Sequence, residues 1–302
     1  MLKGLLSVVK EVLLVKIIVA KTAGFCWGVS RAIDLVMKAA NEGHSPIYTD
    51  GALIHNPQVL KVLEESEIHV SSNIDNVAQG TIAIRAHGIT PERRTHLKEK
   101  GLKIVDATCP HVGGIQGIVK KHAHEGYSIV IVGERGHPEV IGLLGFTQGR
   151  GYLIDADEDL ERVPQLPPDK VCVVAQSTQS RARLHEVTEK VRQIYPSALM
   201  FDTLCDVTAD RQDEILEMAK EVDLMIVVGG KNSGNTQRMA DLSREAGVRT
   251  FHIETEDEIC ASDVEGREVI GLTAGASTPD WMIKRVYQKL EEIAQELVPV
   301  TV

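Results

Sequence analysis

The sequence predicts an α/β protein made of three related units, each with a small and mainly parallel sheet, arranged as a trefoil around a central site. Three observations predict this architecture. A strand, a cysteine and a helix follow one another three times, each copy continues with two more strands, and a polar loop follows every strand. Because parallel sheets bind ligands at the carboxyl ends of their strands, we expect these loops to converge.

We divide the chain at the repeats into an N-terminal extension (residues 1–15) and three α/β units (residues 16–108, 109–204 and 205–302). The strand that opens the first unit can also pack with the third. Residues 1–15 are either a short amphipathic extension that covers a sheet edge or a misassigned start. Charged residues interrupt them, so they form neither a secretory signal nor a membrane span, and we expect a cytoplasmic protein.

The strand that opens each copy leads through a short turn to a cysteine. These strands are residues 16–20, 103–105 and 198–201, and the cysteines are Cys26, Cys109 and Cys205. Apolar residues then recur at helical spacing over residues 29–40, 112–124 and 207–219. Gly43 and Gly126 each lie 17 residues after a cysteine, where a glycine typically ends a helix. The third copy has Val222 there, so the repeat is structural rather than literal.

The two later strands of each copy also end in polar loops. In the first of these loops, His55, His137 and Ser233 follow their cysteines by 29, 28 and 28 residues. The second loops contain His87, Ser177 and Ser277. A single loop of this kind usually does no more than turn the chain. The matched register of three copies favours a shared binding site instead.

The composition limits the possible functions. The chain has 302 residues, 43% of them hydrophobic, and a formal net charge of −10, which is typical of a globular protein and excludes disorder as its main state. This charge argues against a nucleic-acid-binding protein, because phosphate contacts need clustered Lys and Arg. Five cysteines, an odd number at wide spacing, do not form a secreted disulfide framework. We therefore expect reduced thiols in a cytosol.

Three cysteines from three units leave one coordination position of a metal centre open. Such a site suits either a catalytic zinc ion or a four-iron four-sulfur cluster with one iron free to bind substrate. Sulfur-only ligation favours the cluster, since catalytic zinc usually has His or carboxylate ligands, but the spacing leaves both open. Cys172, inside an apolar strand, and Cys260, which has no partner motif, are expected to be core residues.

The other loop residues are hydrogen-bonding groups suited to an anion. Imidazoles, hydroxyls and amides at strand ends can hold phosphate oxygens. These residues are His55, His87, His137, Ser177, Ser233, Asn235 and Ser277. Glu139, two residues after His137, is placed to deliver protons, with a surface salt bridge as the alternative interpretation.

Seven segments in order along the chain carry a family resemblance. They are Gly24-Phe25-Cys26-Trp27-Gly28-Val29, Leu53-Ile54-His55-Asn56, Arg85-Ala86-His87-Gly88, Asp106-Ala107-Thr108-Cys109-Pro110, Gly136-His137-Pro138-Glu139, Lys231-Asn232-Ser233-Gly234-Asn235-Thr236 and Thr273-Ala274-Gly275-Ala276-Ser277. From about Lys16 to about Leu290 the chain thus resembles the 4-hydroxy-3-methylbut-2-enyl diphosphate reductases. This family catalyses the last step of the methylerythritol phosphate route to isoprenoids.

The resemblance implies an iron–sulfur reductase with a 4Fe-4S cluster on Cys26, Cys109 and Cys205. The substrate hydroxyl would bind the unique iron and Glu139 would supply protons, so that two electrons and loss of water yield isopentenyl and dimethylallyl diphosphates. The diphosphate would be held by His55, His87, His137, Ser233, Asn235 and Ser277. An external electron donor, a ferredoxin or a flavodoxin, is expected by analogy.

Two positions depart from the family pattern. Ser177 stands where the family has Thr and keeps the hydroxyl, whereas Gly234 stands where many members have Ser and lacks a phosphate donor. Two other functions stay open. One is a dehydratase of the quinolinate synthase kind, with a three-cysteine cluster and no net redox change; the other is a non-enzymatic cluster-based sensor, against which the lack of an effector or nucleic-acid-binding domain argues.

Overall fold

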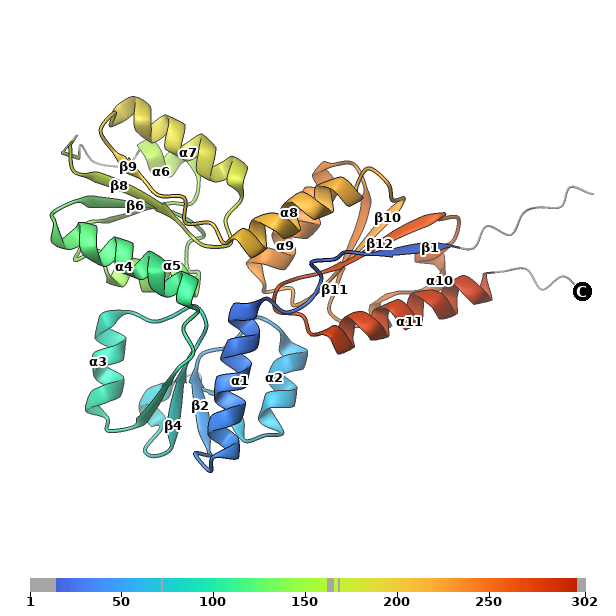
Figure 1. The fold of residues 1–302 in the computed structure, drawn as a ribbon, viewed down its shortest axis with the longest axis horizontal. Helices are drawn as coiled ribbons and strands as arrows, with labels where there is room; N and C mark the ends of the chain where they lie inside the picture. Colours follow the sequence, from blue (N-terminus) through green and yellow to red (C-terminus); the bar gives the residue numbers. More distant parts are fainter. Residues whose placement is uncertain (1–14, 72, 162–165, 168, 298–302) are drawn as a thin grey trace, which may run out of the picture.

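The computed structural model describes residues 15–71, 73–161, 166, 167 and 169–297 of the chain. Three lobes meet at one centre, and each lobe contains one small sheet (Figure 1). The trefoil of α/β units predicted from the sequence is confirmed. Of the predicted N-terminal extension, residues 1–14 lie outside the described residues.

The three sheets have the same strand order. Reading from one edge to the other, the orders are β3-β2-β4-β5, β7-β6-β8-β9 and β11-β10-β12-β1, and every pairing is parallel. The first sheet contains β2 (Ile47–Asp50), β3 (Ile68–Ser71), β4 (Thr81–Ile84) and β5 (Lys103–Asp106). The second contains β6 (Ser128–Val132), β7 (Gly151–Ile154), β8 (Val171–Ala175) and β9 (Leu199–Met200). The third contains β1 (Lys16–Val19), β10 (Leu224–Val228), β11 (Arg249–Ile253) and β12 (Val269–Ala274).

Strand β1 belongs to the third sheet, although the division by repeats assigns it to residues 16–108. It pairs with β12 in the register Lys16↔Val269 to Val19↔Leu272. The same arrangement occurs twice more, since β5 and β9 form the edges of the first and second sheets and lead to the next cysteine. Each lobe therefore ends with a strand from which the chain crosses to the next lobe, and β1 closes the ring.

The helix that follows each cysteine begins at the very next residue. These helices are α1 (Trp27–Asn41), α4 (Pro110–His124) and α8 (Asp206–Met218), and Cys26, Cys109 and Cys205 are their N-caps. Gly43 and Gly126 lie just past α1 and α4 with φ of 78° and 88°, the left-handed conformation that glycine adopts without strain. The predicted helix ends are thus confirmed.

The remaining helices cover the sheets. They are α2 (Pro57–Glu64), α3 (Pro91–Glu99), α5 (Pro138–Gly145), α6 (Asp157–Glu161), α7 (Arg181–Ile194), α9 (Gly234–Glu245), α10 (Ala261–Val264) and α11 (Asp280–Glu296). In the first lobe, α1 and α2 pack on one face of the sheet and α3 on the other (Figure 1). Helices likewise cover both faces of the second and third sheets, so the central strands β6, β8 and β10 are buried along their whole length.

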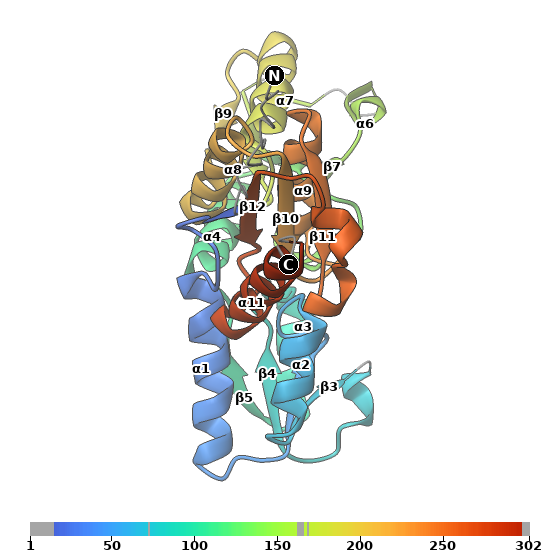
Figure 2. The same cartoon turned by 90° about the vertical axis from the view of Figure 1, so that its right-hand side faces the viewer.

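The C-terminal helix α11 begins beside the first lobe and runs to the outer end of the third, as Figure 2 shows. At this junction the Asn56 amide donates a hydrogen bond to the Met282 sulfur at 3.5 Å. None of the helices in the described part of the chain has the length and apolar character needed to cross a bilayer.

Candidate functional site

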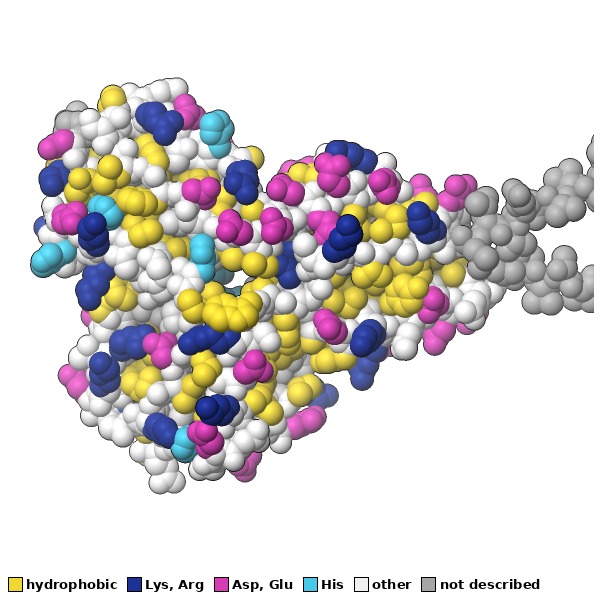
Figure 3. Space-filling model, in the orientation of Figure 1, with side chains coloured by type: hydrophobic (Ala, Val, Ile, Leu, Met, Phe, Trp, Pro, Cys, Tyr) yellow, Lys and Arg dark blue, Asp and Glu magenta, His cyan; other side chains and the backbone are white. Residues whose placement is uncertain are grey.

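The carboxyl ends of the strands face a central cavity of about 120 Å³. On the face seen in Figure 3, a narrow opening lies where the three lobes meet. The cavity is lined by every site residue proposed from the sequence. These are Cys26, His55, His87, Cys109, His137, Glu139, Ser177, Cys205, Ser233, Asn235 and Ser277. The expected convergence of loops from three units is therefore present.

The three cysteines, which we call the sulfur end of the cavity, are placed by one repeated backbone contact. The amide of each cysteine donates to a carbonyl in the loop after the second strand from the edge: Cys26 to Ala276 at 3.1 Å, Cys109 to Ala86 at 2.9 Å and Cys205 to Ser177 at 2.9 Å. Each of these loops follows one of the strands β12, β4 and β8. The sheet of one lobe thus fixes the cysteine that starts the next.

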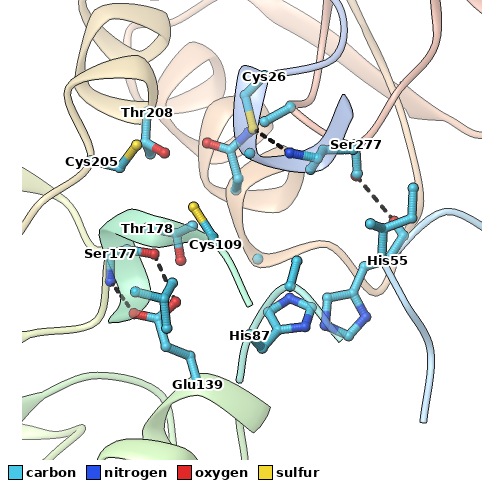
Figure 4. Close-up of a pocket in the computed structure, with 18 of the residues that line it drawn as sticks. Cys26, His55, His87, Cys109, Glu139, Ser177, Thr178, Cys205, Thr208 and Ser277 are labelled. Carbon is cyan, nitrogen blue, oxygen red and sulfur yellow. Dashed lines mark hydrogen bonds between the residues drawn. The ribbon is translucent and has the colours of Figure 1, made fainter. Parts of the chain in front are cut away.

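All five cysteines of the chain are free thiols. Gly28 lies beside two of these sulfurs. A Cβ atom at this position would lie 2.7 Å from the Cys109 sulfur and 3.9 Å from the Cys26 sulfur, so only glycine leaves room for both. Burial raises the pKa of Cys109, and the negative charges of the Cys26 and Cys205 thiolates raise it further. Without a bound cation, this environment disfavours the Cys109 thiolate. The set suits a positively charged metal centre, and Figure 4 shows the three side chains around one space.

The other two cysteines do not reach the cavity. Cys172 is fully buried in β8, where burial alone raises the pKa of its thiol to about 12. It is a core residue, as predicted. Cys260 is exposed at the N-cap of α10, and its thiol donates to Asp263 Oδ2 at 3.0 Å. The prediction that Cys260 is a core residue is therefore wrong, because a surface cap position fits this small polar side chain equally well.

Three imidazoles meet on the opposite wall. The ring centroids of His55 and His87 are 4.6 Å apart, those of His87 and His137 are 5.5 Å apart, and those of His55 and His137 are 5.9 Å apart. Burial lowers the pKa of all three, well below the ordinary range for His87 and to about 4 for His137. Because mutual repulsion and burial both oppose a positive charge, the three rings are neutral near pH 7.

These three rings are close enough for a metal ion, but His137 already uses one nitrogen. Its Nδ1 accepts a hydrogen bond from the Glu139 amide at 3.1 Å, so the neutral ring has its proton on Nε2. His137 therefore presents a donor to the cavity. A donor favours a ligand with oxygen acceptors over a cation.

Several buried polar atoms around the cavity have no hydrogen-bond partner. They include His55 Nε2, His87 Nδ1 and Asn235 Oδ1. Buried polar groups are normally paired, so these atoms indicate a polar ligand. We call the set His55, His87, His137, Ser233, Asn235 and Ser277 the polar end of the cavity. Ser233 and His137 are the N-caps of α9 and α5, whose positive N-terminal dipoles also favour an anion there.

Glu139 lies between the two ends, with only 2% of its surface exposed. Ser177 donates to it twice, from its amide to Oε1 at 2.6 Å and from its hydroxyl to Oε2 at 2.7 Å (Figure 4). Burial raises the pKa of Glu139 despite these hydrogen bonds, which favour the ionised form. A carboxyl group with a raised pKa keeps its proton to a higher pH than an exposed glutamate does, as a general acid requires.

Comparisons with known proteins agree with this geometry. The family model described as "LytB protein" matches residues 17–291. A 4-hydroxy-3-methylbut-2-enyl diphosphate reductase of Opitutus terrae is 43% identical over 290 residues, covering 92% of this chain and all of that protein. The reductase of the same name from Geobacter sulfurreducens is 43% identical over 277 residues, covering 92% and 97%. The chain belongs to the LytB family.

Two solved structures have the LytB architecture seen here. The E-1-hydroxy-2-methyl-but-2-enyl-4-diphosphate reductase from Plasmodium falciparum superposes with a TM-score of 0.86 at 28% identity, covering 90% of this chain and 87% of that one. An (E)-4-hydroxy-3-methyl-but-2-enyl diphosphate reductase described as the terminal enzyme of the non-mevalonate pathway has a TM-score of 0.69 at 40% identity, covering 92% and 99%.

Sequence reasoning missed some residues at the LytB cavity. His111 and Thr208 line it from the first turns of α4 and α8. His111 Nε2 lies 2.9 Å from the Thr203 carbonyl oxygen, so this ring connects the first turn of α4 with the segment between β9 and Cys205. Both residues follow a cysteine closely, His111 by two positions and Thr208 by three. Because the first turn of a helix lies close to its N-cap, this spacing could have indicated that they line the cavity.

Gly234 lies against a charged side chain. A Cβ atom at this position would be 3.2 Å and 3.3 Å from the two carboxylate oxygens of Glu134. Glu134 pairs with Arg238 at 2.5 Å, and Arg238 also donates to Gln179 at 2.8 Å. These contacts join the second and third lobes beside the polar end. The glycine thus leaves room for an ion pair between lobes.

Proposed function

We propose that the chain is a 4-hydroxy-3-methylbut-2-enyl diphosphate reductase that forms isopentenyl and dimethylallyl diphosphates. The reaction takes up two electrons and two protons, breaks a C–O bond and releases water. A site for it must bind a diphosphate, supply protons and deliver electrons. The convergence of three thiols, an anion-binding wall and a buried carboxyl group on one cavity carries the proposal. Membership of the LytB family supports it.

Cys26, Cys109 and Cys205 would hold a 4Fe-4S cluster. Three thiols of separate lobes at one end of the cavity fit a cluster with one iron left without a protein ligand. Zinc fits less well, because the cavity's imidazoles are at the polar end, with His137 Nδ1 already hydrogen-bonded. When bound, the cluster would supply a Lewis-acidic iron and a route for electrons.

The polar end would bind the diphosphate. Its neutral imidazoles, hydroxyls and amide can surround phosphate oxygens, and the N-termini of α5 and α9 add positive potential. The buried atoms His55 Nε2 and His87 Nδ1 would gain partners. Ser277, whose hydroxyl donates to the His55 carbonyl oxygen at 3.2 Å, holds the third lobe against this wall. This arrangement would fix the allylic end of the substrate toward the sulfur end.

Glu139 would supply protons at the reacting carbon–oxygen bond. Its raised pKa keeps a proton available where an exposed glutamate would be ionised. Ser177 holds both carboxyl oxygens in place, so the departure from Thr at this position keeps the hydrogen-bonding group that orients the acid. Protonation of the leaving oxygen lets water depart in place of hydroxide. Replacing Ser177 by a residue without a hydroxyl would remove the hydrogen bond to Glu139 Oε2 and so misplace the acidic proton.

Electrons would come from a separate donor, a ferredoxin or a flavodoxin. We place the enzyme in the cytoplasm, because free thiols and a cluster on three cysteines suit a reducing compartment.

The decisive experiment is anaerobic reconstitution with iron and sulfide, followed by turnover of 4-hydroxy-3-methylbut-2-enyl diphosphate with and without a reductant. The proposal expects about four irons and four sulfides per chain, and two isomeric products that form only with the reductant present. Turnover without reductant would indicate a dehydratase of the quinolinate synthase kind. Binding without any turnover would indicate a sensor or an anion-binding protein.

A further inference from the structure

Arg211 is a buried cation next to the sulfur end. It lies on α8, the helix that starts after Cys205, and only 3% of its surface is exposed. Its guanidinium donates to the Gly24 carbonyl oxygen at 2.7 Å and to the Val207 carbonyl oxygen at 3.0 Å, while Nε has no partner. Gly24 precedes Cys26 by two residues. Arg211 thus connects the backbone leading to one cysteine with the helix that follows another.

A second contact from the same helix face supports this connection. Glu214, one turn after Arg211, accepts hydrogen bonds from the Lys21 amide at 2.7 Å, the Thr22 amide at 2.9 Å and the Thr22 hydroxyl at 2.5 Å. Residues 21–24 therefore rest on α8 at two places. Together with the hydrogen bond from the Cys26 amide to the Ala276 carbonyl, these contacts hold the Cys26 loop on the helix that starts after Cys205.

The charge of Arg211 has no carboxylate hydrogen-bonded to it within the described residues. Both of its acceptors are backbone carbonyls, and burial disfavours the positive charge. The largest opposing influences are the Cys26 and Cys205 thiolates, ahead of Glu214 and Asp210. A buried charge without a counter-ion is strongly unfavourable, so the sulfur end is where its counter-charge belongs.

We propose that Arg211 is a positioning residue of the sulfur end, which holds the Cys26 loop on the Cys205 helix and raises the reduction potential of the cluster bound there. The inference rests on the proposed function, because it concerns the group that the three cysteines would hold. A cluster with three thiolates is anionic and becomes more so on reduction. A buried cation beside two of the thiolates stabilises the reduced state more than the oxidised state.

The test is a spectroelectrochemical titration of the reconstituted protein without substrate, so that the readout is a potential and not turnover. R211Q removes the charge and should make electron binding about tenfold weaker, which is a potential lower by about 59 mV for a one-electron couple. R211K keeps the charge but cannot donate to both carbonyls in the same fork geometry. It should leave the potential close to that of the wild type while a chelator removes iron several-fold faster.

Two matched controls separate charge from position. E214Q loosens residues 21–24 without removing the Arg211 charge, so iron loss should accelerate with no fall in potential. R192Q removes an exposed arginine of α7 that is paired with Glu189, and should change neither quantity. An unchanged potential in R211Q, or a fall in R211K as large as in R211Q, would overturn the electrostatic role. Unchanged iron loss in both R211K and E214Q would overturn the positioning role.

The outcomes also separate this inference from the proposed function. If R211Q fails to fold or to bind iron, the rate of iron loss in R211K and E214Q still tests the positioning role, and a potential in R211K well below that of the wild type still overturns the electrostatic role. A wild-type chain that binds no cluster would refute the proposed function before Arg211 is tested. A wild type that binds a cluster and turns over, with R211Q at the same potential, would refute only the role of Arg211.

Discussion

The sulfur end of the cavity repeats the threefold symmetry of the fold, whereas the polar end departs from it. Cys26, Cys109 and Cys205 occupy the same N-cap position, and each amide donates to a carbonyl of the preceding sheet's loop. At the polar end, the loops with matched register contain different side chains in the three units. His55 and His137 correspond in register to Ser233.

The difference reflects what each end would bind. A cluster held by three equivalent sulfurs tolerates a threefold arrangement, but a diphosphate with one allylic arm has no such symmetry. Two residues after His55, His137 and Ser233, the units have Pro57, Glu139 and Asn235. Only one of these three positions has a carboxyl group, so the acid stands on one side of the substrate. The repeat thus supplied three similar loops whose side chains have diverged.

The strongest test of the sulfur end is removal of single thiols. C26S, C109S and C205S should each lose cluster iron and all measurable reductase activity, because two thiolates and a hydroxyl do not hold the same centre. Iron and acid-labile sulfide per chain after anaerobic reconstitution provide the measurement. C172S is the matched control and should keep both, since Cys172 is in the core of β8.

Equal effects of the three substitutions would support the symmetry of this end. A variant that kept its full iron content and activity would remove that cysteine from the ligand set.

At the boundary of the two ends, E139Q should lower kcat by roughly 10²–10⁴-fold, the usual range for a lost general acid. Binding of the substrate should change little, because Glu139 is not part of the polar end. Anaerobic kinetics give kcat, and a binding titration in the absence of reductant gives affinity. E125Q, at an exposed position after α4, is the control with unchanged rate. A normal kcat in E139Q would exclude Glu139 as the proton source.

The polar end should take up protons when it binds an anion. The pKa values of His55, His87 and His137 are lowered by burial in the free protein, so the rings are neutral at pH 7. A diphosphate raises these pKa values, so binding should strengthen as the pH falls toward the pKa values of the free protein. Calorimetry of inorganic diphosphate in two buffers of different ionisation enthalpy measures the protons taken up, which we expect to approach one per ligand.

Zero uptake would mean that neutral donors alone bind the diphosphate. We expect H87Q to reduce the number of protons taken up. If neutral donors alone bound the diphosphate, H87Q would take up as few protons as the wild type. H185Q, a substitution on α7 outside the cavity, provides the control.

E139Q should also stabilise the fold at high pH. Because burial raises the pKa of Glu139, the folded state binds its proton more tightly than the unfolded state. Stability of the wild type therefore falls as the pH rises from the unfolded pKa through the folded one, by up to about 1.4 kcal/mol per pH unit. E139Q lacks this loss, so the difference in thermal midpoint should grow with pH and vanish in acid. A pH-independent difference would contradict the raised pKa.

The smallest effect concerns Gly234. G234S places a side chain against Glu134, whose ion pair with Arg238 must then shift. Partly exposed ion pairs contribute up to about 1 kcal/mol, so we expect KM to rise by no more than about fivefold. If the added hydroxyl only donated to phosphate, KM would fall instead. E134A combined with G234S should reverse the loss. A lower KM in G234S alone would contradict this expectation, because it would show that Glu134 can move aside without weakening substrate binding.

Much of this architecture could be predicted from the sequence because it depends on local periodicity. The helices after the cysteines, the stop glycines Gly43 and Gly126 and the buried strands β6, β8 and β10 all follow from apolar spacing and backbone conformation. The outer strands β3, β7 and β11 were missed. Each lies at a sheet edge and is only partly buried, so its sequence lacks the continuous apolar run of the central strands.

The polar loops were also found from the sequence, since register among three copies is visible without coordinates. Arg211 was not found from the sequence. An arginine in a helix gives the same sequence pattern whether its guanidinium is in water or donates to the Gly24 carbonyl oxygen. Glu134 likewise gave no signal. Its role depends on Gly234 and Arg238, which are about 100 residues away in the chain.

The sequence by itself determined the three units, the positions of the cysteines and the loops that end the strands, because each of these is fixed within a few residues by spacing and chemistry. The tertiary structure decided which strand closes each sheet, placing β1 beside β12, and how far each titratable group is removed from water. Pairing partners and burial depend on segments distant in the chain. The raised pKa of Glu139 and the buried charge of Arg211 therefore arise only when the lobes meet.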